Sequence, residues 1–421
     1  MMFNTLSIIG LGYIGLPTAT LFAARRKTVV GVDVNQHAVD TINQGKIHIV
    51  EPELDILVHS AVTGGYLRAT TQAEPADAFL IAVPTPFAAG YKPDLSYIEA
   101  AAGAIAPVLD KGNLVILEST SPVGTTEKLA EWLARARPDL TFPQQAGESA
   151  DIQIAYCPER VLPGRVVHEL VSNDRILGGM TQTANAMAAE LYQTFVEGQL
   201  ITTNARTAEM CKLTENSFRD VNIAFANELS IICDKLDINV WELISLANRH
   251  PRVNILQPGA GVGGHCIAVD PWFIVDKTPD EARMVRMARE VNDYKPEWVR
   301  DKVKAAVADA LARSPGHTMA DIKVACLGLA FKPDIDDLRE SPALEIAQEL
   351  SMLGCQILAV EPNIAVLPKR VDQPNILLSS LDEAMAGADV VCVLVKHRSF
   401  IENVEQLGNH PRVVDAVGLL G

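Results

Sequence analysis

The sequence of 421 residues predicts an α/β fold with two doubly wound parallel-sheet domains, joined by a central all-helical domain with a long connecting helix. Three observations lead to this fold class. Short apolar runs alternate with amphipathic stretches in the N-terminal part, helical periodicity alone fills the middle, and the alternation returns near the C-terminus. The length indicates about three domains, because a typical domain has ~150 residues. We expect them to span residues 1–204, 205–313 and 314–421, since the sequence pattern changes near these boundaries.

The N-terminal domain is expected to consist of βαβ units. Its apolar runs are short enough to be buried parallel strands, and they lie at residues 6–9, 28–32, 78–83, 114–117 and 152–156. Amphipathic segments at 17–26 and 96–109 separate some of these runs and are predicted to be helices. Strands connected through helices indicate a mainly parallel sheet.

The middle of the chain carries a helical pattern without strands. Helices are predicted at 209–236, 240–248 and 281–311, with a break at Pro296 because proline has no backbone N–H to donate. A Ser-Pro-Gly segment at 314–316 is typical of a linker. Strands of the C-terminal domain are then expected at 322–327, 356–360, 390–395 and 413–414.

A weak internal repeat supports two related α/β domains. In the first copy a strand leads to a turn at Gly10, then a helix, then a strand that ends in Asp33. In the second copy the same order leads from Gly328 to Glu361. The second copy lacks the later glycines, so we do not expect it to hold a dinucleotide in the standard way.

Composition excludes several classes of protein. Thirty-six basic against 52 acidic residues give a net charge of −16, which disfavours nucleic acid as a partner. Seven scattered cysteines without a Cys-x-x-Cys pair argue against a disulfide framework and favour a reducing, cytoplasmic setting. The uncharged stretch at 7–24 is interrupted by glycines and a proline, so we expect neither a signal peptide nor a membrane span.

The motif Gly10-x-Gly12-x-x-Gly15 directly follows a predicted strand and opens a predicted helix. The first glycine permits a tight turn, the second lets the backbone approach a pyrophosphate, and the third allows close helix–strand packing. Asp33 ends the next strand, where a carboxylate would bind an adenosine ribose and repel a 2′-phosphate. The motif therefore predicts a Rossmann-like domain that binds NAD as its cofactor.

Hydroxyl side chains follow two other strands of the same predicted sheet. Thr85 follows one strand, and Thr120 and Thr126 follow the next. Because ligands lie beyond the carboxyl ends of parallel strands, these hydroxyls suit contacts to a ribose or a nicotinamide. Turn formation and helix capping are the alternative for each of them.

The predicted helix at 209–236 carries a polar stripe. Lys212, Asn216 and Arg219 lie on one face of it, because they are four and three residues apart. A lysine partly removed from water in a cleft can lose its proton and act as a base. The alternative is an ordinary solvated helix face.

A glycine-rich loop precedes one cysteine. Glycines stand at 259, 261, 263 and 264, before His265 and Cys266, and Asp270 follows four residues after the cysteine. Loop amides can surround an oxyanion, and a thiol at a helix N-terminus is an activated nucleophile. We expect Cys266 to be that nucleophile and the other six cysteines to be inert. No histidine at a suitable spacing pairs with His265, so no metal is expected.

A nicotinamide cofactor combined with a nucleophilic thiol indicates a particular reaction. A base such as Lys212 suffices to oxidise an alcohol to an aldehyde. Further oxidation to an acid needs a tetrahedral adduct that can lose a second hydride, and the thiol of Cys266 supplies it. The pair predicts a four-electron oxidation of CH2OH to carboxylate with two NAD+.

Basic side chains near the predicted strand ends and the cysteine loop suit an anionic ligand, although each could be a surface charge. They are Arg160, His250, Arg252, Lys332 and Arg339.

The motifs occur in a fixed order along the chain: Gly10-Leu-Gly-Tyr-Ile-Gly with Asp33, Glu118-Ser-Thr-Ser-Pro-Val-Gly, Lys212-Leu-Thr-Glu-Asn-Ser-Phe-Arg, Gly261-Val-Gly-Gly-His-Cys and Gly328-Leu-Ala-Phe-Lys-Pro. With them the sequence resembles the UDP-glucose/GDP-mannose dehydrogenase family over essentially its whole length. Segments that begin at Phe218 and Asn248 resemble its N-acetylhexosamine branch. This implies oxidation of UDP-N-acetyl-D-mannosamine to UDP-N-acetyl-D-mannosaminuronate, for enterobacterial common antigen or a related surface polysaccharide.

The resemblance also implies roles for individual residues. Cys266 would be the nucleophile, Lys212 would move the proton, Asn216 and Asp270 would support the oxyanion and the hydrolytic water, and Glu159 would act in the thioester step. The residues implied to bind NAD are Gly10, Gly12, Tyr13, Ile14, Gly15, Asp33, Thr85, Thr120, Thr126 and Arg339. Those implied to bind substrate are Arg160, Val161, Lys212, Asn216, Arg219, His250, Arg252, Gly263, Phe331 and Lys332. The family dimerises through the central helical domain, and a neighbouring subunit would supply His250 or Arg252.

Other functions stay open at this point. The substrate could be UDP-N-acetylglucosamine or another UDP-sugar, because one stereocentre separates the two epimers. A two-electron 3-hydroxyacid dehydrogenase has a similar first domain and a helix-borne Lys/Asn pair, but no use for Cys266. A non-catalytic NAD-binding protein is a further alternative.

Overall fold

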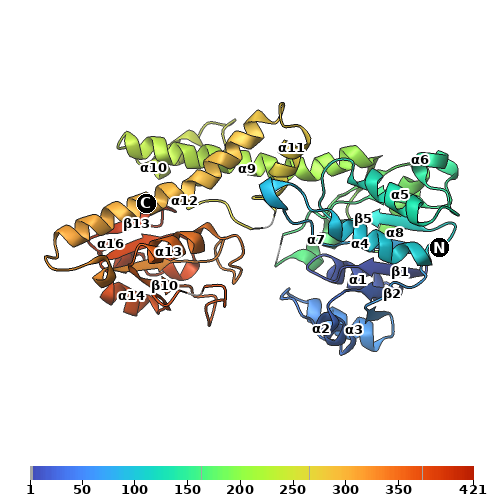
Figure 1. Ribbon diagram of the computed structural model, residues 1–421, viewed down its shortest axis with the longest axis horizontal. Helices are drawn as coiled ribbons and strands as arrows, with labels where there is room; N and C mark the ends of the chain where they lie inside the picture. Colours follow the sequence, from blue (N-terminus) through green and yellow to red (C-terminus); the bar gives the residue numbers. More distant parts are fainter. Residues whose placement is uncertain (1–2, 163, 265, 372) are drawn as a thin grey trace. The chain divides into compact units, whose positions relative to one another are not determined.

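The computed structural model describes residues 3–162, 164–264, 266–371 and 373–421 (Figure 1). Contacts divide the chain into two compact units, Met1–Glu215 and Asn216–Gly421, with the division inside one long helix, α9 (Ala205–Lys235). The predicted boundaries at 204 and 313 therefore stay a prediction, whereas the α/β fold class with a helical middle segment is confirmed.

The described residues of the first unit form an eight-stranded sheet in the order β3-β2-β1-β4-β5-β6-β7-β8. All neighbouring strands are parallel except β6 and β7, which are antiparallel. The strands are β1 (Thr5–Ile9), β2 (Thr28–Val32), β3 (Leu67–Thr70), β4 (Ala78–Ile81), β5 (Leu114–Leu117), β6 (Gln153–Tyr156), β7 (Arg175–Gly179) and β8 (Leu200–Asn204). The sequence pattern did not predict three strands: β3 has four residues, β7 ends in two glycines, and β8 is partly exposed.

Helices cover both faces of this sheet, as a doubly wound fold requires. Ile8 and Leu80 share a buried cluster with Phe22 of α1, while Phe79 shares the other with Ile98 of α4. Alternate residues of each strand thus enter opposite cores. The helices are α1 (Gly15–Ala24), α2 (Gln36–Asn43), α3 (Leu54–Thr63), α4 (Ser96–Ile105), α5 (Thr125–Ala136), α6 (Pro143–Ala146), α7 (Val166–Ser172) and α8 (Gln182–Tyr192), with single turns at Ala89–Tyr91, Ala106–Val108 and Gly147–Ser149.

The second unit contains a parallel sheet in the order β11-β10-β9-β12-β13 among its described residues. Its strands are β9 (Lys323–Leu327), β10 (Gln356–Val360), β11 (Ile376–Leu378), β12 (Val390–Val393) and β13 (Val413–Asp415). Its helices are the last part of α9, then α10 (Val240–Ala247), α11 (Asp270–Lys277), α12 (Arg283–Ala312), α13 (Pro342–Met352), α14 (Leu381–Gly387), α15 (Arg398–Ile401) and α16 (Val404–Gly408), with a turn at Met319–Asp321. Val299 and Val303 of α12 share the buried cluster of β9 and α13.

The predicted break at Pro296 is wrong, because α12 continues through this proline. A proline inside a helix removes one backbone hydrogen bond, and contacts on both sides of it hold α12 together here. Before Pro296, Arg289 and Asn292 bind Asp220 of α9 at 2.7 and 2.8 Å. After it, Val299 and Val303 are fully buried.

The internal repeat is present in the structure at the two glycine turns. Gly10 and Gly328 have φ angles of +90° and +89°, and each donates its N–H to the last residue of the next strand at 2.8 Å. The two turns differ in the carboxylate that accepts their backbone N–H groups. Asp33 accepts the N–H of Leu11 at 2.9 Å, whereas the longer Glu361 accepts two amides of its turn, from Leu329 at 2.8 Å and Ala330 at 3.0 Å. In the C-terminal turn, Glu361 thus occupies the amide donors of Leu329 and Ala330.

In the part of the chain that the structure describes, no helix is both long and apolar enough to cross a membrane.

We expect Asp220→Ala to destabilise the second unit by about 3 kcal/mol, because it leaves the buried guanidinium of Arg289 without its main partner. Urea unfolding followed by tryptophan fluorescence measures this. Asp301→Ala on the exposed side of α12 is the control and should change the free energy of unfolding by less than about 0.5 kcal/mol. Equal effects of the two variants would contradict the importance of the buried pair.

We also expect the stability contributed by Glu361 to disappear in acid. Burial opposes ionisation of this carboxyl, but hydrogen bonds from His397 and the Leu329 and Ala330 amides outweigh it and lower its pKa from 4.5 to about 2. A lowered pKa stabilises the folded chain above the unfolded pKa and loses this effect as the pH falls from about 4.5 towards 2.

Glu361→Gln should therefore be clearly less stable than the unaltered chain at pH 7, with the difference shrinking across that acid range. Thermal unfolding at several pH values measures the difference. Glu383→Gln, at an exposed helix cap, is the matched control and should show a smaller effect. A difference for Glu361→Gln that does not change with pH would show this assignment to be wrong.

Candidate active site

The glycines of the first turn have three different environments. A Cβ atom on Gly10 would lie 2.5 Å from the carbonyl oxygen of Ala82, and one on Gly15 would lie 1.8 Å from that of Gly10. A Cβ on Gly12 would meet no atom within 4 Å. The protein itself therefore requires the first and third glycines, while the second keeps the turn open to a ligand. This environment fits the close approach of a dinucleotide pyrophosphate.

Asp33 is held in place behind this turn. Its carboxylate accepts the backbone N–H groups of Leu11 and Asn35, both at 2.9 Å, and it stays partly exposed. Tyr13 is exposed within the turn, and Ile14 lies at the N-cap of α1. The carboxylate is thus fixed where β2 ends, which suits a contact to the adenosine ribose of NAD.

The threonines at the neighbouring strand ends lie in two different settings. Thr85 donates its hydroxyl to the carbonyl of Thr120, so the chain segments after β4 and β5 are tied together. Thr126 is buried, and its hydroxyl donates to Glu209 of α9 at 2.7 Å. The Thr85 and Thr120 side chains remain partly exposed.

Glu209 is a functional candidate that the sequence analysis missed. This fully buried carboxylate also accepts the N–H groups of Gly124 at 2.6 Å and Thr126 at 2.8 Å, and so caps the start of α5. Burial raises its pKa, although these hydrogen bonds oppose the shift. Its position three residues before Lys212, on the same helix face, is the signal that could have revealed it.

Lys212 is only 7% exposed, and its Nζ lies 3.9 Å from Oε2 of Glu159. Glu159 also accepts the N–H of Val161, which holds the segment after β6. Arg160 pairs with Glu215 of α9 at 2.7 Å. The structure therefore brings Lys212, Glu159, Arg160 and Val161 together within the first unit, as a buried amine beside a carboxylate. Such a pair can exchange a proton with a ligand hydroxyl.

A buried polar cluster at the end of β5 also escaped the sequence analysis. Glu118 accepts the hydroxyl of Tyr192 at 2.5 Å and lies 3.6 Å from the Arg175 guanidinium. Arg175 also donates to the thiol of Cys157 at 3.5 Å. Burial raises the pKa of Glu118 while Arg175 opposes this. The cluster fixes the ends of β5 and β6, which precede Thr120 and Glu159.

In the second unit Cys266 is exposed, one turn before α11. Its carbonyl accepts the N–H of Asp270 at 2.8 Å. The buried carboxylate of Asp270 in turn accepts the amide of Asn216 at 2.5 Å. Cys266, Asp270 and Asn216 are therefore neighbours. Arg219 lies one turn further along α9 and is exposed.

The glycines before Cys266 allow a close contact with the loop after β9. A Cβ on Gly263 would lie 2.2 Å from the carbonyl oxygen of Glu340, and one on Gly264 would lie 3.0 Å from the ring of Phe331. Lys332 extends beside that ring, with Nζ 5.8 Å from its centroid. Gly263, Phe331 and Lys332 thus lie together, and only glycine permits this packing.

The remaining predicted residues lie on the surface. His250 and Arg252 are exposed, and Arg252 donates its N–H to Nδ1 of His250 at 3.3 Å. Arg339 forms an ion pair with Asp337 at 2.6 Å. His265 lies outside the described residues. No group of three or more His, Cys, Asp or Glu that could hold a metal occurs among the residues described.

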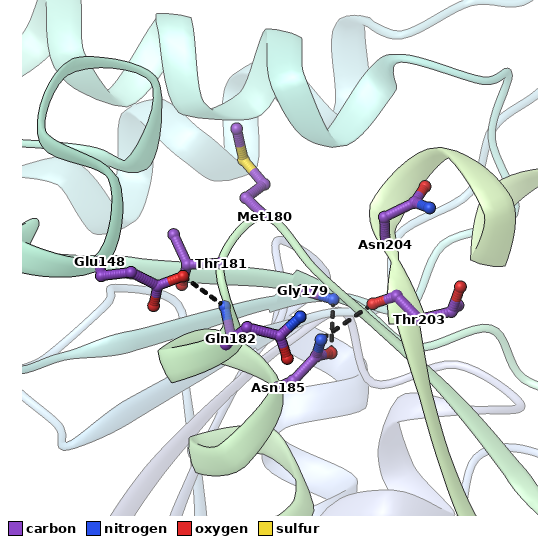
Figure 2. A pocket seen from close by; sticks show the side chains of 8 residues that line it. All are labelled: Glu148, Gly179, Met180, Thr181, Gln182, Asn185, Thr203 and Asn204. Carbon is purple, nitrogen blue, oxygen red and sulfur yellow. Dashed lines mark hydrogen bonds between the residues drawn. The ribbon is translucent and has the colours of Figure 1, made fainter.

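A polar pocket beside the ends of β7 and β8 is a different feature (Figure 2). Glu148 accepts the N–H of Gln182 at 2.9 Å, and Asn185 joins Gly179 at 2.7 Å to Thr203 at 2.9 Å. These groups satisfy one another and cap α8. We therefore do not take this pocket as a candidate site, and describe the glycine turn of the first unit and the cysteine loop of the second each by itself.

The chain is similar over its whole length to proteins of known activity. The chain is 65% identical to UDP-N-acetyl-D-mannosamine dehydrogenase of Escherichia coli K12 over the full length of both chains. It is 64% identical to NDP-N-acetyl-D-galactosaminuronic acid dehydrogenase of Ralstonia nicotianae, covering 94% of this chain and 92% of that one. The structure of a UDP-D-ManNAc dehydrogenase from Pyrococcus horikoshii matches with a TM-score of 0.87 and 38% identity, covering 99% of this chain and 96% of that one.

Three family domains match in order along the chain. The NAD binding domain matches residues 4–196, which confirms the cofactor predicted from the glycine motif. The central domain matches residues 206–294, and the UDP binding domain matches residues 325–421. From these matches and the full-length relatives, the chain belongs to the UDP-glucose/GDP-mannose dehydrogenase family.

Proposed function

We propose that this chain oxidises C6 of UDP-N-acetyl-D-mannosamine from an alcohol to a carboxylate, with two NAD+ per sugar. The observation that carries the proposal is the exposed thiol of Cys266 one turn before buried Asp270, whose carboxylate binds Asn216 on the helix that also bears Lys212. A thiol in this setting has a use in four-electron oxidation and none in two-electron oxidation of an alcohol.

The first oxidation needs a base. Lys212, buried beside Glu159, accepts the proton of the C6 hydroxyl as the alcohol becomes an aldehyde. The Gly10–Gly15 turn and Asp33 would hold NAD+, which would supply the hydride acceptor for each of the two oxidations.

The second oxidation proceeds on Cys266. Its thiolate adds to the aldehyde carbon and forms a thiohemiacetal, whose oxygen is held by Asn216 and Lys212. Loss of the second hydride leaves a thioester. Water, oriented by Asp270 and assisted by Glu159, cleaves it to the carboxylate and returns the thiolate.

The other predicted site residues receive binding roles in this proposal. Residues proposed to contact NAD are Gly10, Gly12, Tyr13, Ile14, Gly15, Asp33, Thr85, Thr120, Thr126 and Arg339. Residues proposed to contact the UDP-sugar are Arg160, Val161, Lys212, Asn216, Arg219, His250, Arg252, Gly263, Phe331 and Lys332. The first domain (1–204) would bind the cofactor, the second (205–313) would carry the nucleophile, and the third (314–421) would bind UDP.

The active form is proposed to be a homodimer through the central helical domain. Large apolar side chains on α9 and α12 support this, because Phe218 and Met284 are each 71% exposed and Phe225, Met287 and Tyr294 are exposed as well. We place the reaction in the cytoplasm. Its product would enter a surface polysaccharide such as enterobacterial common antigen.

A second candidate substrate is the corresponding N-acetylgalactosamine nucleotide, because a relative of 64% identity is an N-acetyl-D-galactosaminuronic acid dehydrogenase. UDP-N-acetylglucosamine remains a third. All three share the C6 hydroxyl, so the proposed chemistry is the same for each.

Cys266→Ser should lower uronate formation by about a thousandfold or more, because a hydroxyl replaces the thiol that forms the thioester. Mass spectrometry of the UDP-sugar products measures this. Cys211→Ser, at a partly exposed cysteine, is the control and should retain activity. Unchanged uronate formation by Cys266→Ser would exclude the thioester route.

Substrate identity is tested by NADH release with each purified nucleotide sugar. We expect two NADH per UDP-N-acetyl-D-mannosamine and a kcat/KM at least about tenfold higher than for the gluco and galacto epimers. Equal kcat/KM values for the three sugars would contradict the proposed specificity. One NADH per sugar would contradict the four-electron reaction.

A further inference from the structure

His397 is a fully buried histidine for which the proposed mechanism has no role. It lies after β12, at the N-cap of α15, in the C-terminal sheet domain. Burying an imidazole has a cost unless both ring nitrogens find partners. Here both nitrogens have a partner: Glu361, which follows β10, and Asp334, which follows β9. Together with His397 after β12, these contacts connect the ends of three strands.

The two partners define the protonation state of the ring. Nε2 lies 3.0 Å from the carboxylate of Glu361, which can only accept a hydrogen bond when ionised, so Nε2 carries the hydrogen. Asp334 donates its backbone N–H to Nδ1 at 2.9 Å, so Nδ1 has none. This assignment of the tautomer from the hydrogen bonds gives a neutral imidazole that donates on one side and accepts on the other.

The charged groups around the ring come from several segments. Glu361 follows β10 and is held by the Leu329 and Ala330 amides. The Asp334 carboxylate lies 3.8 Å from Nδ1 and accepts the N–H of Arg398 at 3.0 Å, with the Arg398 guanidinium 3.9 Å from it. Asn363 lies 3.2 Å from Nδ1, and the ring of Phe400 packs against the imidazole at 5.4 Å.

Asp334 lies in the middle of the loop 331–341, which follows β9. Its φ angle is +59°, in the left-handed region that residues other than glycine adopt only when surrounding contacts hold them there. The bond to His397 is such a contact. The same loop carries Phe331, Lys332 and Arg339, and its residues Phe331 and Glu340 contact the glycines before Cys266.

We propose that His397 is a positioning residue for nucleotide binding, which acts by accepting the Asp334 N–H and so fixing the loop 331–341. This rests on the proposed function, in which that loop contacts the UDP half of the substrate. The bond to Glu361 holds the ring, and the bond to Asp334 transmits its position to the loop. A protonated ring would place an N–H against the Asp334 N–H and lose this contact.

Two substitutions test the hydrogen bonds to Glu361 and to Asp334 one at a time. The side-chain oxygen of His397→Asn can reach the position of Nδ1 and still accept the Asp334 N–H, although it loses the Glu361 contact. The side chain of His397→Gln can reach Glu361 in place of Nε2, but it offers no acceptor at Nδ1. His410→Asn is the matched control, because this half-buried histidine bridges Arg412 and Ala388 elsewhere in the same domain.

Calorimetric titration of the full-length protein with UDP alone measures the proposed effect. We expect His397→Gln to weaken UDP binding by about tenfold, the equivalent of one lost hydrogen bond, and His397→Asn to weaken it by less than about threefold. KM for the UDP-sugar should follow the same order, and KM for NAD+ should rise less, because Arg339 is the one residue of this loop proposed to contact NAD.

Hydrogen exchange of the peptide covering 331–341 supplies a readout that does not depend on binding, with faster exchange expected in His397→Gln than in His397→Asn. The proposal would be overturned if both variants lost the same UDP affinity and this loss followed the fall in their melting temperatures. Unchanged UDP binding in His397→Gln would also overturn it. Failure of the proposed function has a different signature, because the unaltered protein would then release no NADH with any UDP-sugar.

Discussion

Hydrogen bonds from backbone amides to the chain's own carboxylates fix the turns at the ends of the parallel strands. Such amides point out of the sheet and need an acceptor. Asp33 holds the first glycine turn, Glu209 holds the start of α5, and Glu361 holds the C-terminal turn. Each carboxylate comes from a segment far away in the sequence, so each also ties two parts of one unit together. The positions of the candidate site residues depend on these bonds.

The two glycine turns differ in the length of the acidic side chain that binds them, and this difference decides whether a turn stays open to a ligand. Asp33 reaches one amide of its turn, and Gly12 leaves the space beyond it open. Glu361 is longer by one methylene and reaches two amides, while buried Ala330 stands where the first turn has Gly12. The first turn keeps space open at Gly12 for a pyrophosphate, whereas two amides of the second turn are bound to Glu361. Nucleotide binding in the C-terminal domain must then rely on other groups, such as the loop after β9.

Much of this arrangement was predictable from sequence, because periodicity and glycine spacing are local signals. The buried, mainly apolar strands of the first sheet, the Gly10 turn with Asp33 and the Cys266 loop all belong to this kind. The contacts of Glu209, of Glu118 with Arg175, and of Glu361 with His397 were not predictable, since each joins residues that are more than 30 positions apart and leaves no pattern in the chain. The break expected at Pro296 does not occur, because tertiary packing outweighs one missing hydrogen bond.

The exposure of Cys266 has a practical consequence for handling this protein. Five other cysteines are buried and Cys211 is only partly accessible, so an alkylating reagent or peroxide meets one sulfur far more readily than the rest. Mild modification should therefore label a single position on each chain. The fraction of chains labelled then counts the chains whose Cys266 thiol is intact, and reducing agents belong in every storage buffer.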